Sequence, residues 1–329
     1  MRTRLIKVDK WNPEEKLLEE AAKIVKGGGL VAFPTETVYG LGANALDENA
    51  VLSIFRAKNR PIDNPLIVHV SRMEDVHQLA HLNEMALKFM ERFWPGPVTL
   101  VLPAKGVVPK VTTGWLETVA VRMPNHPVAL GLIDKAQVPI AAPSANRSGR
   151  PSPTDAEAVM EDMKNRVDVI LDSGPTDVGV ESTVLYVRNK EVVLLRHGGC
   201  PLEALEEVAP VLVPTKDNSS AKHSPGTRYR HYAPSVPVVI IDEVGRWKEH
   251  PAYLNNISNV GFVGLSAPPV ETKEEIRFDS VVHYGRGLFA ALRAMERWSV
   301  GVILVELPSE SGIGAAVRDR LIRAASEWE

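Results

Sequence analysis

The chain has 329 residues, of which 44% are hydrophobic and 24% charged, and a formal net charge of -3. This length favours two domains, the composition is ordinary for a globular protein, and the near-neutral charge gives no overall attraction to nucleic acid. A single cysteine, Cys200, excludes a disulfide framework and a four-cysteine zinc site, and with no long apolar run we expect a cytoplasmic protein without membrane contact.

The N-terminal part alternates expected strands and helices, which is the pattern of an α/β domain. Its first helix should begin with Asn12 as N-cap and Pro13 in the first turn, and end at Gly27-Gly28-Gly29. The capping-box patterns Ser71-Arg72-Met73-Glu74 and Thr154-Asp155-Ala156-Glu157 predict two more helix starts. The other expected strands are 4–8, 30–33, 65–70, 98–102, 118–122, 139–142, 169–172, 183–187 and 192–196, and the other helices are 49–58, 84–93, 126–135 and 202–208.

The C-terminal part predicts a smaller, doubly wound domain, because buried parallel strands alternate there with helices. The expected strands are 238–241, 260–265 and 302–306, and the helices are 287–298 and 313–325.

Between these parts, 211–237 has no periodicity and is rich in turn-forming residues. Within it, 224–234 places cations and aromatic rings between prolines, which is unusual for a passive spacer. We therefore predict a first domain over 1–210, a linker or lid over 211–237 and a second domain over 238–329.

Polar side chains gather after two of the expected strands. A loop of hydroxyls and glycines follows 30–33, and its Thr35, Thr37 and Tyr39 surround Glu36, which modestly favours a site over an ordinary β-loop. Ser144-Ala145-Asn146 follows another strand, where open α/β sheets place their ligands, although an ordinary turn is an equal alternative.

Cations stand at the ends of two other elements. Lys58 and Arg60 close a helix, where the macrodipole favours positive charge, so a solvated helix end is the simpler interpretation of this pair alone. A guanidinium fork beside a point charge also suits a polyphosphate. Arg122 ends its strand and could clamp a carboxylate or form a surface ion pair, and His69 alternates with apolar neighbours as a core histidine does.

Several motifs in this order resemble the YrdC-like domain family: 34–41, Lys58-Asn59-Arg60, 65–69 and Ser144-Ala145-Asn146. The segments 224–234 and 312–321 resemble the longer, two-domain form of this family, the L-threonylcarbamoyladenylate synthases. The resemblance covers nearly the whole chain. It implies an α/β fold: a YrdC-like twisted open mixed sheet with a deep cleft, plus a smaller Rossmann-like doubly wound C-terminal domain.

The resemblance also implies an activity. The family is a nucleotidyltransferase family that makes L-threonylcarbamoyl-AMP and pyrophosphate from L-threonine, bicarbonate or CO2, and ATP. The product serves the threonylcarbamoyladenosine modification of tRNA next to the anticodon. The implied partners are ATP, L-threonine, bicarbonate and the downstream threonylcarbamoyl-transfer machinery, with tRNA itself as a further candidate. Mg²⁺ would be carried by ATP, without dedicated protein ligands.

By position, the resemblance assigns roles to individual residues. The catalytic residues would be Lys58 and Arg60. The L-threonine side would comprise Thr35, His69, Arg122, Ser144 and Ser182. The ATP-binding residues would be Lys58, Arg60, Asn64, Thr118, Ser144, Asn146, Thr154, Arg196 and Tyr232.

Positioning and charge stabilisation would suffice for this reaction, because the substrates themselves supply the nucleophile and the leaving group. The product is a mixed anhydride that hydrolyses readily, so excluding water would help. We therefore expect 228–232 to close over the site.

Two other interpretations of the same fold remain. A non-catalytic RNA-binding module would show salt-dependent RNA affinity and no threonine-dependent pyrophosphate release. The carbamoyl-transfer module of hydrogenase maturation shares the YrdC-like domain, but that larger protein carries zinc-finger cysteines, and the single Cys200 argues against it.

Overall fold

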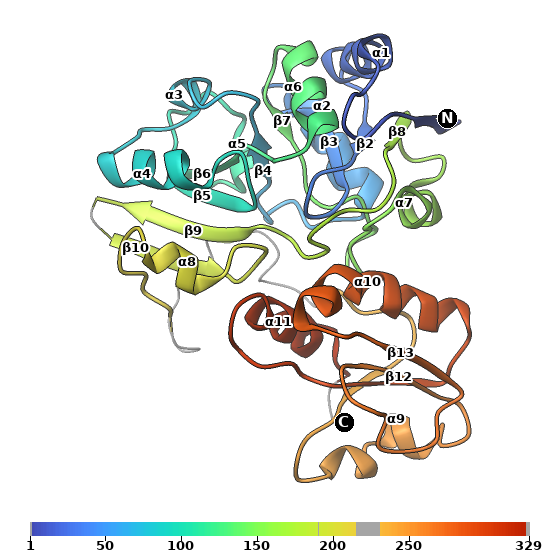
Figure 1. Cartoon of the computed structure of the whole chain (residues 1–329). Helices are drawn as coiled ribbons and strands as arrows, with labels where there is room; N and C mark the ends of the chain where they lie inside the picture. The colour runs from blue at the N-terminus through green and yellow to red at the C-terminus, as the bar shows by residue number, and fades with distance from the viewer. Residues whose placement is uncertain (1, 190, 215–230, 327–329) are drawn as a thin grey trace.

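Two β-sheets, one in each part of the chain, organise the computed structural model (Figure 1). The structure describes residues 2–189, 191–214 and 231–326. The strands of the larger sheet are β1 (Arg4–Lys7), β2 (Val31–Phe33), β3 (Gly40–Asn44), β4 (Ile67–His69), β5 (Val98–Pro103), β6 (Thr118–Arg122), β7 (Ile140–Ala141), β8 (Val169–Asp172), β9 (Thr183–Arg188) and β10 (Glu191–Arg196). Their order is β1-β8-β2-β3-β7-β4-β6-β5-β9-β10, with parallel and antiparallel pairs mixed.

Helices cover both faces of this sheet. They are α1 (Glu15–Lys26), α2 (Glu48–Lys58), α3 (Val76–Leu79), α4 (Glu84–Phe93), α5 (Lys110–Thr113), α6 (Pro127–Ala136), α7 (Ala156–Met163) and α8 (Leu202–Glu206). On one face, Leu18 of α1 and Leu132 of α6 belong to a shared buried cluster. On the other face, Ile54 of α2, Phe89 of α4 and Met163 of α7 join a larger one. Each such buried side chain stabilises the fold by about 1.5–3 kcal/mol.

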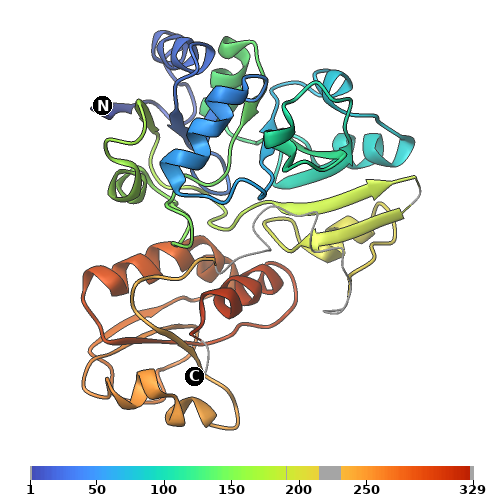
Figure 2. The same cartoon turned by 180° about the vertical axis from the view of Figure 1, so that it is seen from behind.

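The second domain is a parallel sheet with helices on both faces. Its strands are β11 (Val238–Ile240), β12 (Val260–Gly264), β13 (Glu274–Arg277) and β14 (Val302–Val305), in the order β11-β14-β12-β13. Its helices are η2 (Arg246–Glu249), α9 (Pro251–Leu254), α10 (Val281–Arg297) and α11 (Gly314–Ala324). Figures 1 and 2 show α10 and α11 between this small sheet and the first domain. The expected doubly wound domain is therefore confirmed.

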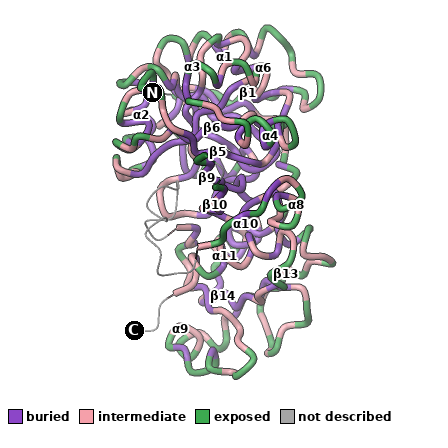
Figure 3. The backbone as a smooth tube through the Cα atoms, turned by 90° about the vertical axis from the view of Figure 1, so that its left-hand side faces the viewer, coloured by how far each residue is buried: buried purple, intermediate pink, exposed green. Residues whose placement is uncertain are grey.

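Burial follows the same plan. Figure 3 shows buried backbone along the strands of both domains, with exposed residues on the outer helices and loops. No described helix is both long enough and apolar enough to cross a membrane.

The expected helix starts are wrong at four places, three of them in the first domain. Helix α1 begins at Glu15 rather than after Asn12, whose backbone nitrogen donates to Asp9 Oδ1 at 2.7 Å in a turn of its own. The pattern at 71–74 caps no helix, because α3 begins only at Val76. At the second capping box Asp155, not Thr154, is the N-cap of α7, and its carboxylate accepts from the Ala158 nitrogen at 2.8 Å.

Strand β3 lies where a loop was expected, and β13 was not expected. The small residues of β3 gave no β-branched signal, but packing requires them: a β-carbon on Gly42 would lie 2.7 Å from the Phe33 ring and 2.8 Å from Ile140. Helix α10 likewise begins at Val281, well before the expected 287, because the Ser280 hydroxyl caps it.

Candidate functional site

A cleft in the first domain collects most of the predicted site residues. It contains about 730 Å³ of space not filled by protein atoms, open solvent at its mouth included. The predicted residues that line it are Thr35, Lys58, Arg60, His69, Arg122, Ser144, Asn146, Ser182, Arg196 and Tyr232. Asn64, Thr118 and Thr154 are absent from this lining.

Lys58 holds the turn that carries Ser144 and Asn146. It is the last residue of α2 and almost completely buried. Its Nζ donates to the carbonyl oxygens of Ser144 and Asn146, each at 2.5 Å, and lies 3.4 Å from Asn146 Oδ1. The Ser144 hydroxyl donates to the same Oδ1 at 2.5 Å. The lysine is therefore a brace for the turn as well as a charge beside the cleft.

The protonation of Lys58 depends on what the cleft holds. Burial, followed by the charge of Arg60, lowers its pKa well below the usual value. Three acceptor oxygens around Nζ favour the ammonium form. A bound polyphosphate would also favour the ammonium form and raise the pKa of Lys58. Anion binding and protonation of Lys58 are therefore coupled.

Arg60 is held by the backbone that follows it. Its Nε donates to the Asn64 carbonyl at 3.3 Å and its Nη2 to the Pro65 carbonyl at 3.1 Å. Asn64, predicted as an ATP contact, is fully buried, and its carbonyl helps to orient the arginine. Arg60 is half-buried, so part of its guanidinium faces the cleft.

Arg122 already has a carboxylate partner. Its Nη2 lies 2.7 Å from Glu36 Oε1, with both side chains buried, as an ion pair without an aligned hydrogen bond. Its other nitrogens donate to Thr37 Oγ1 at 3.0 Å and to the Gly96 carbonyl at 3.1 Å. Thr35 Oγ1 lies 2.8 Å from Thr37 Oγ1. The Thr35 and Thr37 hydroxyls thus form one fixed unit with Arg122, whereas the Tyr39 hydroxyl, also expected around Glu36, donates to the Gly174 carbonyl at 2.7 Å.

His69 and Arg122 are register partners on the parallel strands β4 and β6. Burial, followed by the charge of Arg122, lowers the pKa of His69 to about 3, so its imidazole is neutral at physiological pH. Among the described residues, its Nδ1 has no hydrogen-bond partner. His69 therefore lines the cleft as a neutral imidazole whose Nδ1 is buried.

Ser182 and Arg196 line the cleft and contact each other. The Arg196 guanidinium donates to the Ser182 carbonyl at 2.8 Å, and Ser182 Oγ lies 2.8 Å from Thr99 Oγ1.

Glu181 and Ser152 also line the cleft, and neither was expected there from the sequence. Glu181 accepts from the Ser152 hydroxyl at 2.5 Å and from Arg320 Nε of the second domain at 2.8 Å. The one available signal was the position of Glu181 directly before Ser182.

Tyr232 reaches the cleft from the second-domain side. Its ring stacks on Phe289 of α10 with centroids 5.4 Å apart. The neighbouring His231 lines the cleft as well, and burial, then the charges of Arg60 and Lys58, lower its pKa to about 4. The rest of the expected lid, 228–230, lies outside the described residues.

Thr118 and Thr154 are placed elsewhere. Thr118 begins β6 and Arg122 ends it, so about 13 Å of strand separates them. Thr154 is buried in the loop before α7, where its carbonyl accepts from the Thr176 nitrogen at 2.9 Å. The described residues include no cluster of three or more His, Cys, Asp or Glu side chains that could hold a metal ion.

Known families match both domains. The Sua5/YciO/YrdC family, described as "Telomere recombination", matches residues 23–198. A second family, described as "Threonylcarbamoyl-AMP synthase, C-terminal domain", matches residues 200–326.

Individual relatives match over nearly the full length. A Pyrococcus abyssi protein named "Threonylcarbamoyl-AMP synthase" is 48% identical over 326 residues, covering 95% of each chain. A Bacillus subtilis protein of the same name is 43% identical over 337 residues, covering 96% of this chain and 95% of its own. The crystal structure of P. abyssi Sua5 complexed with L-threonine has a TM-score of 0.90 and 47% identity, covering 98% of this chain and 97% of its own.

Proposed function

Because the chain belongs to the Sua5/YciO/YrdC family of threonylcarbamoyl-AMP synthases, we propose that it forms L-threonylcarbamoyl-AMP and pyrophosphate from L-threonine, bicarbonate or CO2, and ATP. The product would supply the threonylcarbamoyl group for the modification of tRNA next to the anticodon. The observation that carries the proposal is the cleft itself, where Lys58, Arg60, Arg122 and Arg196 meet around small polar side chains.

The chemistry requires alignment rather than a protein nucleophile. The amine of threonine adds to CO2, or to bicarbonate with loss of water, to give a carbamate. A carbamate oxygen then forms a bond to the α-phosphorus of ATP, and the bond from that phosphorus to the bridging oxygen of pyrophosphate breaks. Charge accumulates on the departing pyrophosphate, so fixed cations accelerate this nucleotidyl transfer.

In this proposal ATP binds at the Lys58 side of the cleft. Arg60 would contact phosphate directly, because part of its guanidinium faces the cleft. Lys58 would act through its charge and through the turn that it braces, since its three contacts are all with Ser144 and Asn146. Arg196 is a further nucleotide contact in this proposal.

In this proposal L-threonine binds beside the unit formed by Arg122, Glu36, Thr35 and Thr37. The pair with Glu36 neutralises much of the Arg122 charge, so a substrate carboxylate would be oriented there more than strongly attracted. His69, neutral and lining the cleft, would accept from or donate to the substrate. Thr35 and Ser182 complete this side.

Mg²⁺ would arrive with ATP and shield its phosphates. The carboxylate that lines the cleft, Glu181, is engaged by Ser152 and Arg320, which makes it a poor metal ligand as it stands. The cytoplasmic location expected from the sequence stays a prediction.

The test is to mix the protein with ATP, Mg²⁺ and bicarbonate, with and without L-threonine. Pyrophosphate release and the mass of threonylcarbamoyl-AMP are then measured. Release that requires threonine supports the proposal. Release that is absent, together with RNA affinity that falls steeply with salt, would replace it with a binding module of the same fold.

A further inference from the structure

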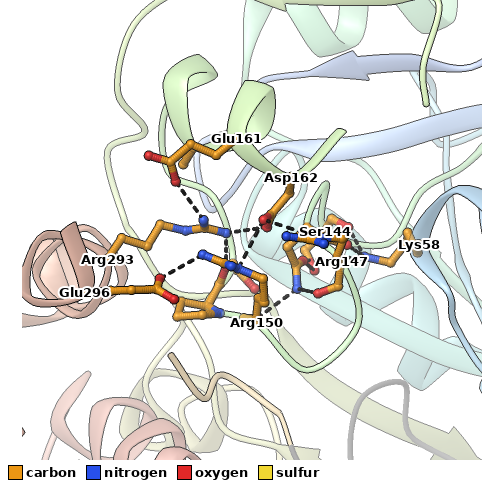
Figure 4. A network of polar contacts seen from close by, with 12 residues as sticks. Lys58, Ser144, Arg147, Arg150, Glu161, Asp162, Arg293 and Glu296 are labelled. Atoms are coloured by element: carbon orange, nitrogen blue, oxygen red, sulfur yellow. Dashed lines mark hydrogen bonds and ion pairs between the residues drawn. The ribbon is translucent and has the colours of Figure 1, made fainter. Parts of the chain in front are cut away.

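A buried carboxylate, Asp162, lies where the two domains meet (Figure 4). It belongs to α7 of the first domain, and its side chain has no exposed surface. Its Oδ2 accepts from Arg293 Nη2 of α10 at 2.6 Å, and its Oδ1 lies 3.1 Å from Arg150 Nε. One carboxylate therefore joins a second-domain arginine to a first-domain loop.

Arg293 of α10 donates hydrogen bonds to three acceptors of the first domain. Its side chain is 2% exposed, and it donates to Asp162, to Glu161 Oε2 at 3.1 Å and to the Pro151 carbonyl at 2.6 Å. A planar guanidinium satisfies three acceptors only in one orientation. Docking of α10 thus fixes the backbone at Pro151 and the carboxylate beside it.

The same network reaches the cleft through Arg150. The carbonyl of Arg150 accepts from Asn146 Nδ2 at 2.8 Å. The other end of this amide, Asn146 Oδ1, accepts from Ser144 Oγ and lies near Lys58 Nζ. In Figure 4 the contacts run without a break from Arg293 to Lys58. The side-chain orientation of Asn146 is therefore set by the loop that contains Arg150, and this loop is held in place by contacts with the second domain.

A second set of contacts holds the same loop in place. Glu296, one turn beyond Arg293 on α10, accepts from Arg150 Nη2 at 2.7 Å and from the Ser235 nitrogen at 3.1 Å. The Ala233 nitrogen donates to the Gly149 carbonyl at 2.8 Å. Both α10 and the end of the linker therefore contact this loop.

We propose that Arg293, Asp162 and Arg150 are positioning residues, through which docking of the second domain sets the affinity of the cleft for ATP. None of the three lines the cleft, so they act through Asn146 and not on the substrate. The identity of the nucleotide rests on the proposed function. The contacts from Arg150 reach the cleft at Asn146, which is expected to contact ATP and not L-threonine, so the effect is on ATP.

The experiment compares Arg293→Met and Arg150→Met with Arg297→Met in the full chain. Arg297 is the matched control, because it lies one turn further along α10 and pairs with Glu161 without reaching Asp162. Equilibrium binding of ATP is measured by calorimetry, and KM for ATP and for L-threonine by pyrophosphate release. Thermal unfolding shows that each variant is folded.

We expect both test variants to weaken ATP binding and raise KM for ATP at least about tenfold, the scale expected when a contact turn is misplaced. KM for L-threonine and every constant of Arg297→Met should stay within about twofold of the wild type. If Arg293→Met does not fold, Arg150→Met decides, because it leaves the pair between Arg293 and Asp162 in place.

A domain contact with no positioning role gives a different pattern. It would lower the unfolding temperature or the active fraction and leave the affinity for ATP unchanged in both test variants, which would overturn the proposal. Equal rises in KM for ATP and for L-threonine would overturn it as well. Failure of the proposed function is separate, because wild-type protein would then bind ATP without releasing pyrophosphate in response to threonine.

Discussion

Arg320 of α11 lies over the ring of Tyr232, with its guanidinium carbon 5.2 Å from the ring centroid. The same guanidinium donates to Glu181 Oε2 at 2.8 Å and to the His197 carbonyl at 2.9 Å, and the side chain is completely buried. One second-domain arginine therefore fixes both an aromatic ring and a carboxylate that line the cleft of the first domain.

We expect Arg320→Met to destabilise the protein by about 3–5 kcal/mol at neutral pH, because it leaves the Glu181 carboxylate buried without its cation. Burial raises the pKa of Glu181, but Arg320 and Arg196 outweigh it and hold the pKa below its usual value. The stabilisation is therefore present above the unfolded pKa and is lost as pH falls through the folded one. Denaturant unfolding at neutral and acidic pH measures it.

The control for this prediction is the second variant Arg320→Met with Glu181→Gln. Removing the buried charge as well should recover part of the lost stability. A double variant as unstable as the sum of the two single ones would contradict the role given to the ion pair.

Lys58→Met should weaken the use of ATP. The substitution removes a cation and leaves the carbonyls of Ser144 and Asn146 without their donor. The stabilisation of the transition state should therefore drop by about 2–3 kcal/mol, which lowers kcat/KM for ATP roughly 30- to 150-fold. Pyrophosphate release at varied ATP measures this loss. Arg56→Met is the matched control, because Arg56 is exposed in the last turn of the same helix and does not line the cleft. Wild-type kinetics in Lys58→Met would exclude Lys58 from the site.

The part of the site that could be predicted from the sequence is the part marked by local patterns. Lys58 and Ser144 are 86 positions apart, yet each stands at the end of a recognisable element and belongs to a family motif. Glu181 carries no such mark, because its partner Arg320 is 139 positions away and in the other domain. Contacts between domains depend on docking, which leaves no periodicity in either segment.

The fold shows the same division. Strands rich in Val, Ile and Leu, such as Val302–Val305, were predicted because a buried parallel strand is apolar throughout. Gly40–Asn44 was taken for a loop, because glycine and alanine are poor strand formers whatever their packing. The first turns of α10 were missed for a related reason: Gly285 disfavours a helix, but a β-carbon there would lie 3.1 Å from the Ile313 side chain.

Two buried histidines, His69 and His126, and the half-buried His231 predict a stability that falls on the acidic side. Burial, as the largest cause in each, lowers the pKa of His69 to about 3 and those of His126 and His231 to about 4. Unfolded histidine takes up its proton near pH 6.5, so the unfolded state binds more protons between there and the folded pKa. Stability should fall by up to about 1.4 kcal/mol per pH unit for each histidine as pH drops below about 6.5, and be independent of them above it.

His126→Asn isolates one of these contributions. His126 caps α6 through Nδ1, which accepts from the Val128 nitrogen at 3.2 Å, and asparagine can cap in its place without titrating. Denaturant unfolding between pH 4.5 and 6 should show a slope shallower by about one proton, with little change at pH 7.5. An unchanged slope would mean that His126 is not buried as a neutral group.

A pair of glycines offers the sharpest test of domain docking. Gly179 has φ +81°, and a β-carbon there would lie 2.3 Å from the Arg286 carbonyl oxygen of α10. Gly174 has φ +85°, but a β-carbon there would have no atom within 4 Å. Alanine at either position costs about 1–2 kcal/mol in backbone strain. Only Gly179→Ala also pushes α10 away, and with it Arg293.

We therefore expect Gly174→Ala to lose some stability but to keep pyrophosphate release near the wild-type rate. Gly179→Ala should lose more stability and most of its release, with a larger radius of gyration in X-ray scattering. Equal behaviour of the two variants would show that close docking of α10 is not needed for turnover.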